Sequence, residues 1–131
     1  MSSWYLVIHR YNRDRLISRS LLAVAANYLL YHRLSKKILI IDLDVHQGNG
    51  TAKLFENNDC VFTFSMHGAR NYPHRKEQSD LDLALPDGTD DATYLALLRD
   101  TLPRLLADPR FEVVEADPGF DSQLATLCGP R

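Results

Sequence analysis

Apolar and polar residues follow one another along this chain in a pattern that predicts alternating strands and helices. Runs of β-branched, aromatic and apolar residues predict strands, and apolar residues three or four positions apart predict helices. The predicted strands cover residues 5–9, 38–42, 60–66, 81–85 and 111–116, and the predicted helices cover residues 20–34, 50–56 and 91–106. Residues 12–19 are charged and are expected to be irregular.

The strand predicted at residues 38–42 begins with four apolar residues in succession, without alternation. Such a run is typical of a strand that is buried on both faces of a parallel sheet. Strands that alternate with helices indicate an α/β domain. We therefore expect a three-layer α/β/α fold with a mostly parallel sheet and residues 38–42 in its middle. Pro103 lies inside the last predicted helix and predicts a kink there.

Cap residues and apolar stripes add detail to the predicted helices. Asn49 or Thr51 is a candidate N-cap of the short middle helix, and Thr89 or Asp90 is a candidate for the long last one. The residues expected to be buried are Leu22, Ala25, Ala26, Leu29 and Leu30 in the first helix, and Tyr94, Leu97, Leu98, Leu102 and Leu105 in the last.

Length and charge narrow the class of protein. A chain of 131 residues is expected to form a single domain with a modest core. A net charge of −2 gives no electrostatic reason to expect nucleic acid or an anionic membrane as partner. No apolar run approaches the roughly 18 residues of a membrane span. Cys60 and Cys128 lack metal-site spacing, which favours a reduced, cytoplasmic setting, and Cys60 is expected in the core.

Three side chains that can bind a metal, Asp42, Asp44 and His46, follow the central apolar run. Residues two apart in an extended backbone point to the same side, and open α/β sheets place their sites at the carboxyl ends of the strands. Carboxylate and imidazole are both zinc ligands. The pattern favours a divalent metal site in which Asp44 and His46 are ligands and Asp42, one step deeper, orients a neighbouring group.

Two other interpretations of this segment stay open. In one, the acids are charges near a helix N-terminus and His46 is a hydrogen-bonded loop histidine. In the other, Gly48-Asn49-Gly50-Thr51 begins a helix that binds phosphate. The second lacks the longer glycine patterns of nucleotide-binding loops.

The residues around this segment resemble the histone deacetylase family. The resemblance rests on Ile-Ile-Asp-Leu-Asp-Val-His-Gln-Gly-Asn-Gly-Thr at residues 40–51, Val-Phe-Thr-Phe-Ser-Met-His at 61–67, Gly-Ala-Arg-Asn-Tyr-Pro at 68–73 and Leu-Pro-Asp-Gly-Thr-Asp-Asp-Ala-Thr-Tyr-Leu at 85–95. The last stretch is most similar to the class IV branch and to bacterial deacetylase-like amidohydrolases. The resemblance covers residues 21–107 well.

The resemblance implies an arginase/deacetylase-like fold, here truncated to one partial domain over residues 1–131. It also implies a zinc-dependent deacetylase that acts on acetylated lysine or a related acetyl-amide. Zinc would be bound by Asp44, His46 and an aspartate further on, for which Asp121 is preferred and Asp117 is the alternative. The resemblance also implies that Asp42 lies in the second ligand shell and that the backbone carbonyls of Asp42, Asp44, His46, Ser65 and Met66 surround a structural K⁺. It implies that Tyr72 lies in the wall of the substrate tunnel, and the alternative for Tyr72 is a plain surface tyrosine.

The remaining polar residues near these segments are expected to have lesser roles. His67 is expected in a pocket wall, with a role as third metal ligand less favoured. Arg70, Arg75 and Lys76 are expected to be solvated charges.

The chain departs from the family pattern in two ways. It lacks the family's histidine pair, and it lacks the Gly-Gly-Tyr segment that carries the oxyanion tyrosine. We therefore expect this polypeptide to be inactive on its own and prone to self-association. The alternative is a non-catalytic remnant of a deacetylase-like domain that binds a metal or a partner.

Overall fold

The computed structural model of the chain describes residues 4–9 and 15–107, with side chains from residue 22 onward. In chain order the elements are β1 (Trp4–His9), α1 (Arg15–Tyr31), β2 (Lys37–Asp42), α2 (Asn49–Phe55), β3 (Val61–Gly68), β4 (Leu81–Leu85) and α3 (Asp91–Ala107). Every element predicted within these residues is present. The strand predicted at residues 111–116 lies outside the described residues.

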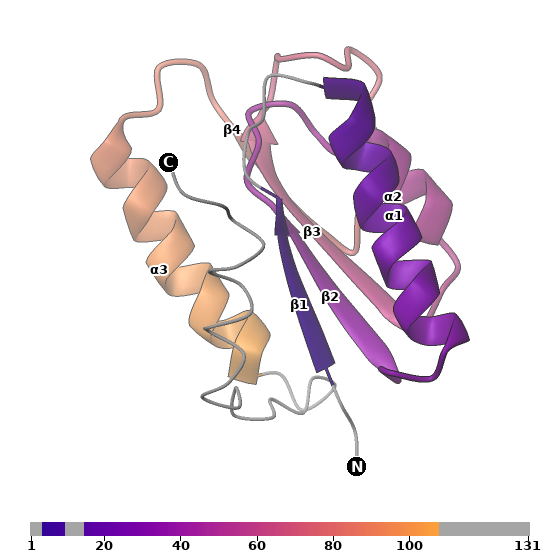
Figure 1. Ribbon diagram of the computed structural model, residues 1–131. Helices are drawn as coiled ribbons and strands as arrows, with labels where there is room; N and C mark the ends of the chain where they lie inside the picture. Colours follow the sequence, from indigo (N-terminus) through magenta and orange to yellow (C-terminus); the bar gives the residue numbers. More distant parts are fainter. Residues whose placement is uncertain (1–3, 10–14, 108–131) are drawn as a thin grey trace, which may run out of the picture.

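The four described strands form one parallel sheet in the order β1-β2-β3-β4 (Figure 1). The register pairs Asp42 at the end of β2 with His9 of β1 on one side and with Ser65 of β3 on the other. β2 is therefore an inner strand, as its apolar run predicts. Because the strands are parallel, the carboxyl ends of all four lie along one edge of the sheet.

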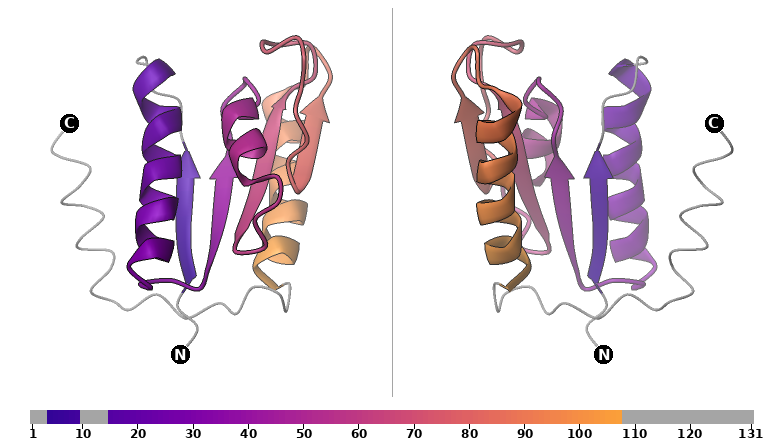
Figure 2. Two further views of the ribbon diagram at one scale, coloured as in Figure 1. Left: turned by 90° about the vertical axis from the view of Figure 1, so that its right-hand side faces the viewer. Right: turned by 90° about the vertical axis from the view of Figure 1, so that its left-hand side faces the viewer.

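Helices cover both faces of the sheet: α1 and α2 pack on one face and α3 on the other (Figures 1 and 2). Side chains of β2 alternate between the two layers. Ile38 and Ile40 join the core on the side of α1 and α2, whereas Leu39 and Ile41 join the core against α3. All four are at most 4% exposed. The predicted three-layer α/β/α fold is confirmed, and the unbroken apolar run is explained by burial on both faces.

The helix predicted at residues 20–34 in fact begins at Arg15 and ends at Tyr31. The prediction of an irregular stretch at 12–19 is therefore wrong from Arg15 onward. At the other end, the N–H of Leu34 donates to the carbonyl of Leu29 and the N–H of Arg33 donates to that of Leu30. Arg33 has a φ of 56°. This is a Schellman cap with arginine where glycine usually stands, so the sequence carries no glycine signal for it.

The caps of α2 and α3 differ in kind. Gly48 occupies the N-cap position of α2 and makes no side-chain hydrogen bond, so neither Asn49 nor Thr51 caps that helix. Asp90 caps α3, because its Oδ1 accepts the N–H of Thr93 at 2.8 Å. α3 runs on through Pro103 to Ala107.

Three residues expected to be buried are not. Ala25 and Cys60 are exposed, and Leu97 is 36% exposed. Each lies at the border of an apolar stripe or strand, where spacing alone does not decide the orientation. The core against α3 contains Leu105, with Leu98 and Leu102 packed beside it.

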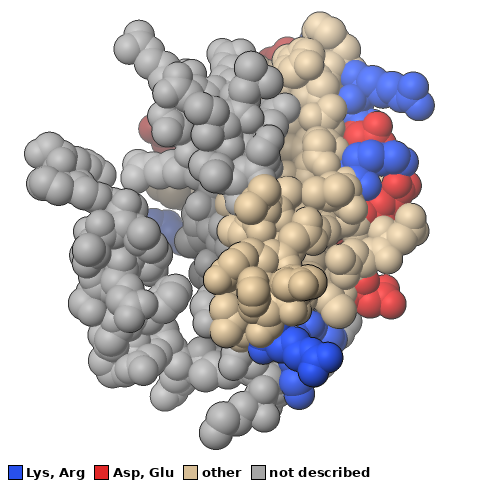
Figure 3. Space-filling model, turned by 45° about the vertical axis from the view of Figure 1, so that its right-hand side comes forward, with Lys and Arg blue, Asp and Glu red and all other residues tan. Residues whose placement is uncertain are grey.

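The outer surface of α1 and α2 combines apolar and charged side chains. Figure 3 brings this side of the molecule forward: basic and acidic groups alternate along one margin, beside a broad area of other residues. The exposed apolar residues of this layer and of the turn after α1 are Val24, Tyr28, Tyr31, Leu34 and Leu54. Among the described helices, none combines the length and apolarity that crossing a membrane would require.

Candidate metal centre and its rim

The segment between β2 and α2, residues 43–48, carries Asp44 and His46 at the carboxyl end of the inner strand. Oδ1 of Asp42 accepts the N–H of Asp44 at 3.0 Å, and Oδ1 of Asp44 accepts the N–H of His46 at 2.8 Å. Asp readily makes such contacts with a backbone N–H two residues ahead. The segment is therefore a bend held by its own carboxylates, rather than the extended strand end that the spacing suggested.

The bend brings the two candidate ligands into direct contact. Nδ1 of His46 lies 2.9 Å from Oδ1 of Asp44, and the two side chains are 16% and 12% exposed. An ionised carboxylate only accepts hydrogen bonds, so the ring N–H is the donor. Oδ2 of Asp44 and Nε2 of His46 make no hydrogen bond to any described residue.

This pair fits a zinc site in chemistry and in spacing. A tetrahedral zinc with ligand bonds of about 2.0–2.2 Å holds neighbouring donor atoms about 3.4 Å apart, so the observed 2.9 Å requires only a small separation of the two groups. Metal binding between these atoms would displace the shared proton. Within residues 4–9 and 15–107, no group of three or more His, Cys, Asp or Glu side chains is arranged to hold a metal. Asp121 and Asp117, the candidates for the third ligand, lie outside the described residues.

Asp42 is buried beneath this pair and is 6% exposed. Its backbone is in register with Ser65 of β3, which is itself 2% exposed and precedes the 1% exposed Met66. Of the residues for which the resemblance implies a second-shell or K⁺ role, Asp42, Ser65 and Met66 therefore lie side by side on adjacent strands. A Cβ added to Gly48 would overlap Oδ2 of Asp42. The glycine after the bend thus leaves room for the buried carboxylate.

His67 lines a hollow of about 420 Å³ at the carboxyl ends of β2, β3 and β4, as the pocket-wall prediction expected. Its Nδ1 lies 3.0 Å from Oγ of Ser65 and 3.9 Å from Oδ1 of Asp82. Both partners approach the same ring nitrogen, so the three residues do not form a serine–histidine–aspartate relay. Burial lowers the pKa of His67, and the nearby Asp82 opposes that shift only in part.

Tyr72, expected in the wall of a substrate tunnel, stands beside the candidate metal ligands. Its ring centroid lies 6.4 Å from that of His46, with the rings at 66° to one another. The side chain is 59% exposed, so the ring lies at the rim and is not part of the core.

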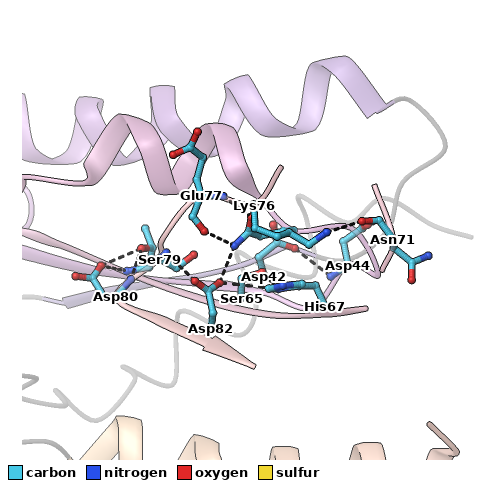
Figure 4. A network of polar contacts seen from close by, with 12 residues as sticks. Asp42, Asp44, Ser65, His67, Asn71, Lys76, Glu77, Ser79, Asp80 and Asp82 are labelled. Atoms are coloured by element: carbon cyan, nitrogen blue, oxygen red, sulfur yellow. Dashed lines mark hydrogen bonds and ion pairs between the residues drawn. The ribbon is translucent and has the colours of Figure 1, made fainter. Parts of the chain in front are cut away.

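Two functionally placed residues were missed by the sequence reasoning. Gln47 is 1% exposed and binds the loop between β3 and β4 from a distance of 30 residues along the chain. Lys76, expected to be solvated, donates from Nζ to the carbonyls of Asn71 and Pro73. Figure 4 shows Lys76 in the polar network that also contains Asp82. The only sequence signal for Gln47 is its place between His46 and Gly48.

The alternative of a phosphate-binding helix start is disfavoured by the same geometry. α2 has only seven residues. The carboxylate of Asp42 packs against Gly48 at the N-terminus of α2, so a phosphate there would face a buried carboxylate.

Comparisons with known proteins show which family this chain resembles. A family model described as the histone deacetylase domain matches residues 20–126. The chain is 45% identical over 108 residues to an uncharacterized protein of Picosynechococcus, an alignment that covers 82% of this chain and 36% of that protein. It is 31% identical to histone deacetylase 18 of Arabidopsis thaliana, covering 82% of this chain and 18% of that protein. The chain thus spans little more than a third, or less, of the length of these relatives.

A solved structure shares the fold. The crystal structure titled HDA15 HD domain superimposes with a TM-score of 0.52 at 23% identity, covering 82% of this chain and 41% of that one. The parallel sheet, the covering helices and the family match over most of the sequence lead to one conclusion: this chain belongs to the histone deacetylase family.

Proposed function

We propose that this chain provides the metal-binding core and part of the substrate rim of a zinc-dependent deacetylase, which hydrolyses acetyl-lysine or a related acetyl-amide. The observation that carries the proposal is the contact between Asp44 and His46 at the carboxyl end of the inner parallel strand, in a chain of this family. Carboxylate and imidazole donors at such a position suit a catalytic zinc.

Asp44, His46 and Asp121 would hold the zinc, with Asp117 as the alternative third ligand. When bound, zinc supplies a Lewis acid for the acyl carbonyl and lowers the pKa of bound water. The chain's own residues orient these donors: Asp42 fixes the backbone of Asp44, and Asp44 fixes that of His46. Support of this kind commonly tunes metal affinity. The carbonyls around Asp42, Ser65 and Met66 would take a structural K⁺.

The rim residue Tyr72 supports a substrate with an extended apolar stem. Its exposed ring stands across from His46 at the outer side of the pair. An aromatic face at this position would pack against the methylene chain of an acylated lysine and would exclude water from one side of the donors.

A second candidate, a metal-binding remnant without catalysis, is favoured by the distribution of histidines. The sequence has five, and no two are adjacent. Metal binding is common to both candidates, whereas hydrolysis belongs only to the first.

Zinc titration of the purified chain by calorimetry tests the proposal. We expect one zinc per chain, and we expect Asp44→Ala and His46→Ala each to abolish stoichiometric binding. His74→Ala is the matched control, because His74 is an exposed histidine of the neighbouring loop. Unchanged zinc affinity in the Asp44→Ala/His46→Ala double variant would refute the assignment. Asp121→Ala and Asp117→Ala, compared side by side, decide the third ligand.

A further inference from the structure

The side chain of Gln47 pairs with the backbone of the rim loop, residues 69–80. Its Nε2 donates to the carbonyl of Glu77 at 2.6 Å, and its Oε1 accepts the N–H of the same residue at 2.9 Å. Nε2 also donates to Oδ1 of Asp82 at 3.0 Å. The amide thus imitates one rung of a β-ladder. Because Gln47 is 1% exposed, water does not replace these bonds when they are lost.

Gln47 anchors one end of the rim loop, and backbone bonds anchor the other. The N–H of Gly68 donates to the carbonyl of Val45, and the N–H of Ala69 donates to that of Leu85. The end of the loop near Glu77 is also held by Asp82, whose Oδ2 accepts the N–H of Ser79 (Figure 4). Gly68 and Glu77 are therefore both tied to the bend at residues 43–48.

Tyr72 lies between these two anchors. Its ring is 59% exposed, so burial contributes little to its position. Lys76 holds the loop backbone around Tyr72, because its Nζ donates to the carbonyls of Asn71 and Pro73 on either side of Tyr72. The placement of the Tyr72 ring beside His46 therefore depends on the loop backbone and its anchors.

We propose that Gln47 is a positioning residue that sets the spacing between the metal-binding bend and the rim loop, and thereby holds the ring of Tyr72 against that of His46. Gln47, which is next to the candidate ligand His46, would in this way govern how an acylated side chain binds. The effect on the binding of an acylated side chain rests on the proposed function, whereas the effect on the position of the Tyr72 ring does not.

The ring contact can be measured directly by NMR on the whole chain with labelled Tyr and His. We expect a nuclear Overhauser contact between the rings of Tyr72 and His46 in the wild type. It should be lost in Gln47→Ala and kept in Gln78→Ala. Gln78 is the matched control, because it is an exposed glutamine of the same loop. Persistence of the contact in a folded Gln47→Ala chain would overturn the inference.

A charge exchange provides the second variant, in case Gln47→Ala does not fold. Gln47→Glu places a carboxylate against Asp82 and should break the ring contact. Adding Asp82→Asn returns a donor to the pair, and the amide oxygen of the new side chain can still accept the N–H of Ser79, so the contact should recover in part. Two results would each count against the assigned role of Gln47. One is that Gln47→Glu keeps the ring contact. The other is that Gln47→Glu loses the contact and the double variant recovers none of it.

Ligand binding separates this inference from the proposed function. An acetyl-lysine peptide should bind the zinc-loaded Gln47→Ala chain up to about tenfold more weakly than the wild type, because the displaced Tyr72 ring would no longer pack against the acylated side chain. Zinc affinity should be unchanged. If the wild type binds zinc and not the peptide, the proposed substrate is wrong, and the ring contact alone decides the role of Gln47.

Discussion

The Cα of Gly48 lies directly against the carboxylate of Asp42, so that even a methyl group at position 48 would overlap Oδ2. The carboxylate has little freedom to move, because it is 6% exposed and Oδ1 holds the backbone of Asp44. This glycine therefore links the packing of the central strand to the shape of the bend at residues 43–48.

Gly48→Ala should destabilise the protein by about 1–3 kcal/mol, the usual cost of overpacking a buried site. It should also weaken zinc binding, because the displaced Asp42 carries the backbone of Asp44 with it. The matched control is Gly50→Ala: nothing lies within 4 Å of the added Cβ. Because Gly50 is exposed in the first turn of α2, that change should alter the stability by no more than about 0.5 kcal/mol. Urea unfolding measures both variants, and a Gly48→Ala chain as stable as Gly50→Ala would contradict the steric argument.

Leu105→Ala should cost about 2–5 kcal/mol, as expected for a cavity in a close-packed core. Leu105 is 6% exposed and packs with Leu39, Ile41 and Phe64 beneath α3. Leu106→Ala removes the same side chain from the neighbouring position, which is 38% exposed. Its effect should stay within about 1 kcal/mol. Similar losses of stability in the two variants, measured by urea unfolding, would contradict the assigned face of α3.

Much of the fold could be predicted because its signals are local. The uninterrupted apolar run at residues 38–41 indicates burial on both faces of the sheet, and the alternation of strands and helices indicates a parallel sheet. Asp90 was a candidate cap, and it does cap α3. Each of these depends on residues that are close together in the sequence, where side-chain type and backbone preference act directly.

Other features depend on contacts that the sequence does not display. Gln47 meets Glu77 across 30 residues, and no local pattern links the two. In the sequence Lys76 has the character of a surface charge, whereas in the structure its Nζ donates to two carbonyls of the loop. Arg33 ends α1 with a positive φ, which the sequence would have indicated only if a glycine stood there. The candidate ligands Asp44 and His46 were recognisable by type, but their mutual hydrogen bond arises from the bend.

The buried imidazole of His67 should make stability depend on pH. Burial lowers its pKa in the folded protein below the ordinary value of about 6.5, although Asp82 and Asp42 act in the opposite direction and Lys76 in the same one. As the pH falls through about 6.5, the unfolded chain takes up the proton first. The stabilisation is therefore complete above that pH and is lost between it and the lower folded value.

Wild-type protein should accordingly lose more stability between about pH 7.5 and about pH 5.5 than His67→Asn, since only the former carries this histidine. Urea midpoints at the two pH values measure the difference. His74→Asn, which removes an exposed histidine, should keep the wild-type loss. An unchanged pH dependence in His67→Asn would show that other groups cause it.

The 131-residue chain alone is expected to show little or no catalytic activity. Acyl transfer at a zinc site requires a general base and a donor for the developing oxyanion. His9 is placed in register with Asp42, but it stands beside Arg10 and not beside a second histidine. His67 is 2% exposed and bonded to Ser65. No tyrosine follows Tyr94 in the sequence.

The zinc-loaded chain should therefore hydrolyse an acetyl-lysine peptide with a kcat/KM well below ~10⁴ M⁻¹s⁻¹, the lower end of the usual enzyme range. Loss of a general base alone costs about 10²–10⁴-fold, and loss of the oxyanion donor adds to that. The measurement compares zinc-loaded with chelated protein, so that only zinc-dependent turnover is counted. A rate within the usual range would contradict the prediction and would mean that residues of this chain supply both groups. His9→Ala and His67→Ala would then identify the base by which of them removes the rate, with His74→Ala as the control.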